Sequence, residues 1–235
     1  LRTWTTTLSM KSSPEPLAKR SRATPDTLIG QSVAAIDTPA LVVDLDAMEH
    51  NLARMTEFAR KHQVRLRPHA KMHKSAALAR LQVRAGAVGV CVQKTSEAEA
   101  LAAGGVSDIY ISNEVIARPK LRRVAALAHE LNAVGGRLAI AVDSLEGIER
   151  LAAAIAENDQ LNRPLDPGKS ADPLQDANLA GFDTRKTSID VFIEIDVGQG
   201  RCGVPPGEAA VALAHAIDGQ RSLRFAGLPA YHGRA

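Results

Sequence analysis

The sequence predicts an α/β fold, a (β/α)8 TIM-type barrel that lacks its last strand. From residue 36 onward, short runs rich in β-branched residues alternate with segments of helical spacing. The short runs show no apolar–polar alternation, which is typical of parallel strands covered by helices. Polar side chains cluster at one end of the expected sheet, after the runs, as they do in barrel enzymes.

Seven short strands are expected, and their count fits a (β/α)8 barrel without its last strand and helix. They are Leu41–Leu45, Val64–Pro68, Val88–Val92, Ile109–Ser112, Leu138–Val142, Val191–Val197 and Leu223–Leu228. The longest interval, between the fifth and sixth strands, holds Pro164, Pro167 and Pro173 among many polar residues. We expect residues 158–188 to form a surface insertion on an intact barrel.

Segments of helical periodicity fill the intervals between these strands. The apolar sets are Met48, Leu52, Met55 and Ala59; Leu121, Val124, Leu127 and Leu131; Ile148, Leu151, Ala152 and Ile155; and Val211, Ala214 and Ile217. Ser96 and Glu99 have the spacing of a capping box, which predicts a helix start there. An open doubly wound sheet is the alternative architecture, but no Gly-rich turn follows the first strand.

Composition and charge exclude several classes of protein. Hydrophobic residues make up 45% of the 235 residues and charged residues 23%, which excludes a chain that is disordered throughout. No apolar run approaches the roughly 18 residues that span a bilayer, so no membrane partner is expected. The net charge of +3 resides in residues 1–30, so the folded part has no cationic bias toward nucleic acid.

The ends and the cysteines bear on location. Residues 1–35 are expected to be a flexible, basic tail rich in Ser and Thr, with a mitochondrial transit peptide over residues 1–30 as the alternative. Cys91 and Cys202 form no disulfide framework and are expected to act as small apolar groups, so a cytoplasmic location is expected. The chain starts at Leu1 rather than Met and stops at Ala235, so we expect its last structural element to be left out.

Lys71 is the sharpest candidate for chemistry. It lies beyond a strand end, close in sequence to His69, His73 and Lys74. Neighbouring positive charge and burial would favour its amine form, as an imine-forming lysine requires. The equally weighted alternative is a solvated basic loop. The two histidines lack the third ligand that a metal site needs, and we expect hydrogen-bonding roles for them.

A second group of candidates follows the last two strands. The glycine-rich run Gly198–Gly203 could cradle an anion, although it lacks the Lys-Ser/Thr of a nucleotide-binding P-loop. Within it, Arg201 is either a partner for a phenolate or carboxylate or a surface arginine. Glu194 is as well suited to ion pairing as to acid–base work. Tyr231 either offers its hydroxyl to a bound ring or packs.

Six motifs together resemble those of the fold-type III pyridoxal 5'-phosphate (PLP) enzymes of the D-threonine aldolase and D-serine dehydratase family. They are, in chain order, DTPALVVDLDAMEHNL, RPHAKMHKS, CVQKTSEAEAL, ISNEVI, EIDVGQGRCGV and FAGLPAYHG. The resemblance runs from about Asp37 to Gly233, with an interruption at 158–188. The GQGRCGV and ISNEV motifs are closer to the D-threonine aldolase branch, which includes 3-hydroxy-D-aspartate aldolases.

This resemblance implies a barrel of the alanine racemase type followed by a C-terminal β-domain. It implies that the amine of Lys71 binds PLP covalently, with Gln93 and His69 lining the site. Arg201 would face the phenolate oxygen of the cofactor, and Tyr231 its pyridine ring. The implied reaction is retro-aldol cleavage of a D-3-hydroxy amino acid to glycine and an aldehyde. A divalent metal (Mn, Mg or Zn) grips the substrate hydroxyl in this family.

Two family features fall outside the sequence. The groups that hold the PLP phosphate around the eighth strand, and the His and Asp or Cys that bind the metal, would follow Ala235. No residue of this sequence therefore takes a metal role, and we expect a catalytically incomplete chain with two open barrel edges. Pro229 also stands where the aldolases carry a polar residue.

Alternatives to the aldolase interpretation stay open. D-serine dehydratase and 3-hydroxy-D-aspartate aldolase activities fit the same motifs. A PLP-binding barrel without catalysis that serves cofactor homeostasis, a non-functional gene product and a structural barrel without PLP are further alternatives. The expected partner is a small D-amino acid. A homodimer is the assembly to consider, because barrels of this type often build their sites at a dimer interface.

Overall fold

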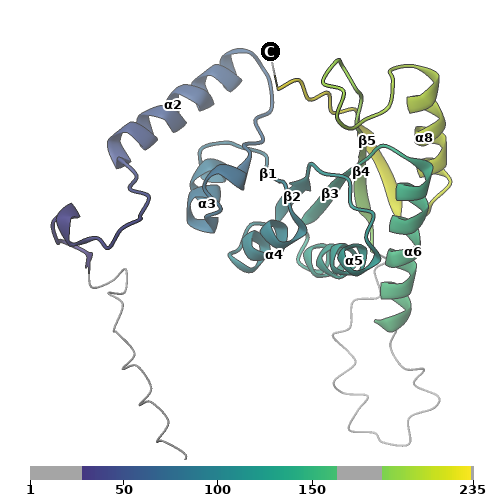
Figure 1. Ribbon diagram of the computed structural model, residues 1–235, viewed down its shortest axis with the longest axis horizontal. Helices are drawn as coiled ribbons and strands as arrows, with labels where there is room; N and C mark the ends of the chain where they lie inside the picture. Colours follow the sequence, from purple (N-terminus) through teal and green to yellow (C-terminus); the bar gives the residue numbers. More distant parts are fainter. Residues whose placement is uncertain (1–27, 163–186, 234–235) are drawn as a thin grey trace, which may run out of the picture. The chain divides into compact units, whose positions relative to one another are not determined.

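The computed structural model describes residues 28–162 and 187–233 (Figure 1). Two compact units are distinguished, residues 1–45 and 46–235, and each is described by itself. Most of the tail expected over residues 1–35 and of the insertion expected over 158–188 lies outside the described residues.

The described part of the first unit holds one short 3₁₀ helix, η1 (Val33–Ala35). The hydroxyl oxygen of Ser32 accepts a hydrogen bond from the Ala34 amide at 3.3 Å, as a capping residue does. The strand predicted at Leu41–Leu45 is wrong: residues 41–44 have no regular structure, and Leu41 is 96% exposed. An apolar run becomes a strand only beside a partner strand, and no strand pairing among the described residues involves this run.

The second unit consists of a five-stranded sheet and the helices that connect its strands (Figure 1). Its helices, the first of which begins at the unit boundary, are α2 (Leu45–Lys61), the 3₁₀ helix η2 (Ala70–Met72), α3 (Ala76–Arg84), α4 (Thr95–Ala103), α5 (Arg118–Ala133), α6 (Leu145–Leu161) and α8 (Glu208–Asp218). Its strands are β1 (Val90–Val92), β2 (Asp108–Ile111), β3 (Arg137–Val142), β4 (Ile189–Ile193) and β5 (Leu223–Gly227).

The strand order distinguishes the two architectures that the sequence left open. The order is β1-β2-β3-β4-β5, and every neighbouring pair is parallel. A doubly wound sheet reverses its strand order near the middle, whereas a barrel adds each strand beside the previous one. The described sheet therefore has the order of a barrel.

The helices pack against one face of this sheet, as they do in a barrel. Ile109, Ile111, Leu138 and Ile140 belong to one buried core cluster together with residues of α4, α5, α6 and α8. Since successive residues of a strand point to opposite faces, the residues between them point away from the helices. That second face carries polar side chains at both ends of the strands, and the carboxyl ends hold the predicted site.

The segment predicted as a strand at Val64–Pro68 is not a strand, although it runs beside β1. The carbonyl oxygens of Leu66 and Pro68 accept hydrogen bonds from the amides of Val88 and Cys91 at 2.9 and 2.8 Å. Pro68 has no amide hydrogen to return, which limits the ladder to an isolated bridge between His69 and Cys91.

The helix start predicted from Ser96 and Glu99 is displaced by two residues toward the N-terminus. Helix α4 begins at Thr95, with Lys94 at its N-cap position. A carboxylate oxygen of Glu97 accepts hydrogen bonds from the amides of Gln93 and Lys94 at 3.0 and 3.2 Å. Glu97 thus takes the place in the capping box that the sequence analysis gave to Glu99.

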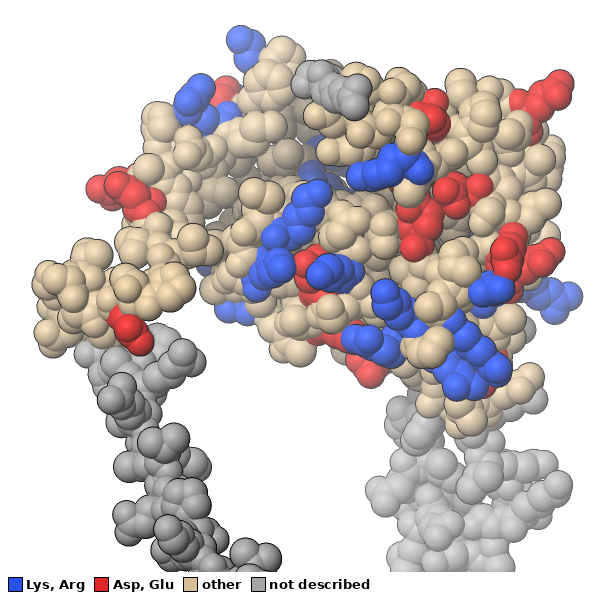
Figure 2. All heavy atoms as spheres, viewed as in Figure 1, with Lys and Arg blue, Asp and Glu red and all other residues tan. Residues whose placement is uncertain are grey.

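The surface shows no broad separation of charge on the face drawn in Figure 2. Acidic and basic side chains lie beside one another over that face. None of the helices in the described ranges is both long and apolar enough to cross a lipid bilayer.

Candidate functional site

Lys71 lies in η2, directly after the segment that runs beside β1. Its side chain is exposed, which agrees with the alternative of a solvated loop and not with burial. Within the described part of the chain, no hydrogen bond or ion pair engages its amine. The lysine therefore presents an unpaired amine at the carboxyl end of the sheet, where a ligand could reach it.

His69 fixes the backbone that carries Lys71. Its Nδ1 atom accepts a hydrogen bond from the Lys71 amide at 3.3 Å, and its Nε2 atom lies 3.3 Å from the Ser112 hydroxyl. The Ser112 hydroxyl donates its own hydrogen to the Val92 carbonyl oxygen at 3.1 Å. Since that hydroxyl has only one hydrogen, it must accept from Nε2, so His69 carries its hydrogen on Nε2.

The electrostatic surroundings of His69 agree with this neutral tautomer. Burial lowers the pKa of the His69 ring, and the nearby positive charge of Lys71 lowers it further. A protonated ring would also lose the lone pair on Nδ1 that accepts the Lys71 amide. His73 likewise accepts a hydrogen bond, from the Ser75 amide at 3.1 Å, so both histidines have the hydrogen-bonding roles expected for them.

Gln93 follows β1 on the same edge of the sheet. Its side-chain amide nitrogen donates a hydrogen bond to Oδ1 of Asn113 at 3.2 Å. Asn113 follows Ser112, so Gln93 and the His69 relay are joined through residues 112–113 at the end of β2. The structure thus brings Gln93, His69 and Lys71 to one edge of the sheet.

The loop after β4 is held closed at its base. The Asp196 amide donates to the Val204 carbonyl oxygen and the Val204 amide to the Glu194 carbonyl oxygen, both at 2.9 Å. Oδ1 of Asp196 accepts hydrogen bonds from the amides of Gly198 and Gly200 at 2.9 and 3.0 Å. These bonds lower the pKa of the Asp196 carboxyl, so its role is to fold the loop.

Arg201 and Tyr231 meet at this loop, as the sequence predicts for two residues of one site. The Arg201 guanidinium carbon lies 4.8 Å from the centroid of the Tyr231 ring, which is cation–π geometry. The strand-end segments around them are tied together, since the Ile195 amide donates to the Pro229 carbonyl oxygen at 2.9 Å. Arg201 also lies 3.5 Å from Oε1 of Glu194.

Glu194 is a buried acid with a second acid beside it. Its side chain is 7% exposed. Burial and a hydrogen bond with the Glu114 carboxyl raise the pKa of Glu194 to about 7, although the Arg201 charge opposes the shift. Two adjacent carboxyls cannot both ionise easily, so this pair retains a proton near neutral pH.

Cys202 departs from the role of a small apolar group that the sequence suggested. One ligand-type atom from each of Glu114, Asp143 and Cys202 lies within 4.8 Å of the other two. Burial raises the pKa of the Cys202 thiol, and the negative charge of Glu114 raises it further. Asp143 also accepts a hydrogen bond from the Gly203 amide at 3.2 Å.

Sequence reasoning did not assign roles to Ser112, Glu114 or Asp143. Ser112 and Asp143 directly follow β2 and β3, and Glu114 lies two residues beyond Ser112. Their position at the carboxyl ends of strands was a signal that could have identified them. Ser112 and Glu114 stand in the ISNEVI motif, but that motif assigned neither of them a role. Only the fold brings Ser112 to His69, and Glu114 and Asp143 to Cys202.

Comparisons with known proteins agree with this arrangement. The family model described as "Alanine racemase, N-terminal domain" matches residues 43–235. The chain is 38% identical over 208 residues to a 3-hydroxy-D-aspartate aldolase of Paracoccus denitrificans, an alignment that covers 88% of this chain and 46% of that protein. It is 38% identical over 204 residues to a D-threonine aldolase of Arthrobacter sp, covering 87% of this chain and 45% of that protein.

A solved structure is similar over the same region. The crystal structure of D-threonine aldolase from Filomicrobium marinum matches with a TM-score of 0.68 and 41% sequence identity, over 86% of this chain and 46% of that one. The chain thus spans just under half the length of the relatives that it matches. The family model, the sequence relatives and the barrel-type fold agree, and the chain belongs to the family of the alanine racemase N-terminal domain.

Proposed function

We propose that this chain binds PLP through Lys71 and serves an aldolase-type lyase that cleaves D-3-hydroxy amino acids to glycine and an aldehyde. The observation that carries the proposal is that Lys71, His69, Gln93, Arg201 and Tyr231 all lie at the carboxyl edge of one parallel sheet. The identity of 38% to two aldolases supports the same reaction class.

The side chains on this edge fit PLP. Lys71 offers an exposed amine without a partner in the described residues, as covalent attachment to an aldehyde requires. Arg201 is 47% exposed, so it can pair with a ligand oxygen, and the Tyr231 ring beneath it offers an apolar surface. When bound, PLP supplies an electron sink for negative charge at the substrate Cα atom.

Glu194 sets the charge that Arg201 presents. A protonated Glu194 does not neutralise the guanidinium 3.5 Å away, so Arg201 keeps its full positive charge for a phenolate oxygen. Once Glu194 ionises, it competes with the ligand for Arg201. His69 keeps the Lys71 backbone in place through its Nδ1 acceptor, and Ser112 holds the ring of His69.

The finer points of the function rest on resemblance. D-threonine is the substrate we favour, with D-serine dehydration and cleavage of 3-hydroxy-D-aspartate as alternatives. A divalent metal belongs to the proposed reaction, and we assign it no ligand among the described residues. A homodimer and a cytoplasmic location belong to the same proposal.

Borohydride trapping tests the attachment to Lys71. The purified chain is incubated with PLP, reduced, digested and examined by mass spectrometry for a pyridoxyl adduct. We expect the adduct on Lys71 in the wild type, its loss in Lys71→Ala, and its retention in Lys94→Ala. Lys94 is a suitable control because it is exposed, with its side chain making no cap hydrogen bond at the start of α4.

Two results would contradict the proposal. The first is labelling spread over Lys74, Lys94 and other lysines in the wild type. The second is the absence of any adduct at PLP concentrations that label free lysine. Glycine release from D-threonine by the same preparation then tests the lyase reaction separately from cofactor attachment.

A further inference from the structure

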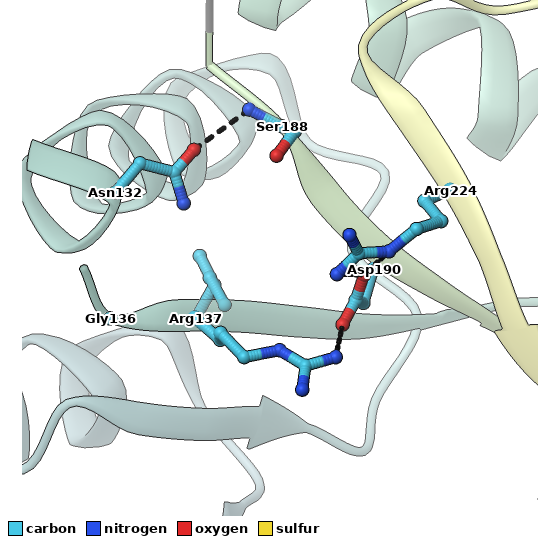
Figure 3. Close-up of a pocket in the computed structure, with 7 residues that line it drawn as sticks. Asn132, Gly136, Arg137, Ser188, Asp190 and Arg224 are labelled. Carbon is cyan, nitrogen blue, oxygen red and sulfur yellow. Dashed lines mark hydrogen bonds and ion pairs between the residues drawn. The ribbon is translucent and has the colours of Figure 1, made fainter. Parts of the chain in front are cut away.

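A polar pocket of about 420 Å³ lies at the amino ends of β3, β4 and β5, the opposite end of the sheet from Lys71 (Figure 3). It is lined by Asn132, Gly136, Arg137, Leu138, Ser188, Asp190 and Arg224. Its size lies within the range of small-molecule sites, about 300–1,000 Å³. The proposed function uses none of these residues.

Two arginines in this pocket share one buried carboxylate. Nη2 of Arg137 lies 2.5 Å from Oδ2 of Asp190, and Nη2 of Arg224 lies 2.5 Å from Oδ1. The Asp190 side chain is 6% exposed, whereas the two arginine side chains are 58% and 62% exposed. One carboxylate balances only one of the two guanidinium charges, so the lining carries one excess positive charge.

Neighbouring charges do not cancel this excess. Asp108 lies directly opposite Arg137 in the register of β2 and β3, but it is paired with Arg67 at 2.6 Å. Asp159 accepts a hydrogen bond from the Thr187 hydroxyl at 2.5 Å and does not line the pocket. The three arginines and two aspartates along the amino end of the sheet therefore sum to a positive charge.

The pocket also presents donors that are held in place. Oδ1 of Asn132 accepts a hydrogen bond from the Ser188 amide at 2.8 Å, so the side-chain nitrogen of Asn132 is its free end and points into the pocket (Figure 3). Each guanidinium has five N–H groups. The contacts with Asp190 use one nitrogen of Arg137 and two of Arg224. The remaining donors come from different elements, α5, β3 and β5, and surround a small volume.

We propose that this pocket binds the phosphate group of a small molecule. Fixed guanidinium forks match the oxygens of phosphate, and donors that approach from several directions suit a tetrahedral anion. Asp190 holds both forks in position before the ligand arrives. The volume exceeds what inorganic phosphate needs, which leaves room for the organic part of a phosphomonoester. This inference does not depend on the proposed function, because the pocket lies at the other end of the strands.

Titration of the full chain with inorganic phosphate, and separately with glycerol 3-phosphate, tests the proposal. The readout is the NMR resonance of the Nε–H groups of Arg137 and Arg224, at constant ionic strength. We expect a saturable shift of both resonances. Tighter binding of glycerol 3-phosphate than of phosphate identifies a phosphomonoester, and equal binding identifies the free anion.

A charge variant with a matched control completes the test. Asn132→Asp keeps the acceptor for the Ser188 amide but replaces the free donor with negative charge, so phosphate binding should weaken about tenfold or more. Gln160→Glu makes the same change of charge on an exposed position of α6, outside the pocket, and should leave binding unchanged. The proposal is overturned if sodium chloride produces the same shifts as phosphate, or if Asn132→Asp binds phosphate as tightly as the wild type.

Discussion

The two ends of the sheet each place an arginine beside a buried acid, yet the two acids have different partners. At the amino end, Asp190 contacts two guanidinium groups at 2.5 Å. At the carboxyl end, Glu194 has one guanidinium at 3.5 Å and a second carboxyl, Glu114, beside it. The two side chains are almost equally buried, 6% and 7% exposed. The two acids therefore differ in the charged groups beside them and not in their burial.

This difference separates the tasks of the two ends. Two arginines hold Asp190 in place and thereby tie together the amino ends of β3, β4 and β5. The Glu114–Glu194 pair retains a proton near neutral pH and leaves the charge of Arg201 available. The end with the proposed chemistry is therefore the end whose charge changes with pH. The predictions below disturb one end or the other, from the largest expected effect to the smallest.

Gly203→Ala should disturb the carboxyl end most. Gly203 has a φ of +97°, and an added Cβ would lie 2.7 Å from the Asp196 amide nitrogen and 3.0 Å from the Glu194 carbonyl oxygen. Both contacts are with backbone atoms that the loop's own hydrogen bonds hold in place. We expect a loss of about 3–4 kcal/mol in the free energy of unfolding, measured by urea denaturation.

A neighbouring glycine provides the control for this loop. Gly200→Ala also has a positive φ, but the space around an added Cβ is open, so the loss should be about 1 kcal/mol. Equal losses for the two variants would show that the close approach at Gly203 is unimportant.

Stability should fall as the pH rises through the range in which Glu194 ionises. The pKa of its carboxyl is raised from 4.5 to about 7 in the folded chain, so between these values the folded state binds more protons than the unfolded state. The free energy of unfolding should therefore decrease from pH 4.5 to pH 7, by at most about 3 kcal/mol. Urea denaturation at pH 5 and pH 8 measures the change.

Glu194→Gln should remove most of that pH dependence. The amide is neutral at every pH and keeps the shape of the protonated acid. The variant should be more stable than the wild type at pH 8 and similar to it at pH 5. If both proteins lose the same stability between pH 5 and pH 8, another group causes the loss.

Much of the barrel could be predicted from the sequence, because buried strands and helices require regularly placed apolar residues. The apolar runs that became β1 to β5 and the helical sets in α5 and α6 form the core. The run at Leu41–Leu45 has the same composition but no strand partner, and composition cannot reveal a missing partner. The displaced start of α4 has a different cause. Both Glu97 and Glu99 could have capped it, and only the fold selects Glu97.

The candidate site, like the fold, could be predicted from the sequence only in part. Lys71, Arg201 and Tyr231 stand in motifs, so the sequence identified them. Glu114 and Glu194 come together only in the folded sheet, because both follow strands that end at the same edge, and no local sequence pattern records that. The sequence left burial and exposure of Lys71 open, because sequence spacing says nothing about how deeply a loop is covered.

Asp190→Asn should destabilise the amino end by about 2 kcal/mol. The substitution keeps the size of the side chain but removes the charge that both arginines share, leaving two guanidinium groups to repel each other. Their exposure of about 60% lets water compensate for part of the loss. Asp218→Asn, on an exposed position at the end of α8, is the matched control and should change stability little. Urea denaturation at pH 8 separates the two outcomes, and equal stability of both variants would contradict a shared role for Asp190.

Ser112→Ala should have the smallest effect on stability and a specific effect on His69. The variant removes the acceptor for the His69 Nε2 hydrogen and the donor to the Val92 carbonyl, at a cost of about 1 kcal/mol. Without that acceptor, the Nε2-protonated tautomer loses its preference, and the Nδ1 acceptor for the Lys71 amide is populated less. The ¹⁵N chemical shifts of the His69 ring measure the tautomer directly, without cofactor. Ser112→Thr keeps the hydroxyl and should preserve the wild-type shifts, and so should Ser96→Ala on the exposed side of α4. Unchanged ring shifts in Ser112→Ala would mean that the relay from Ser112 to Lys71 does not hold the histidine.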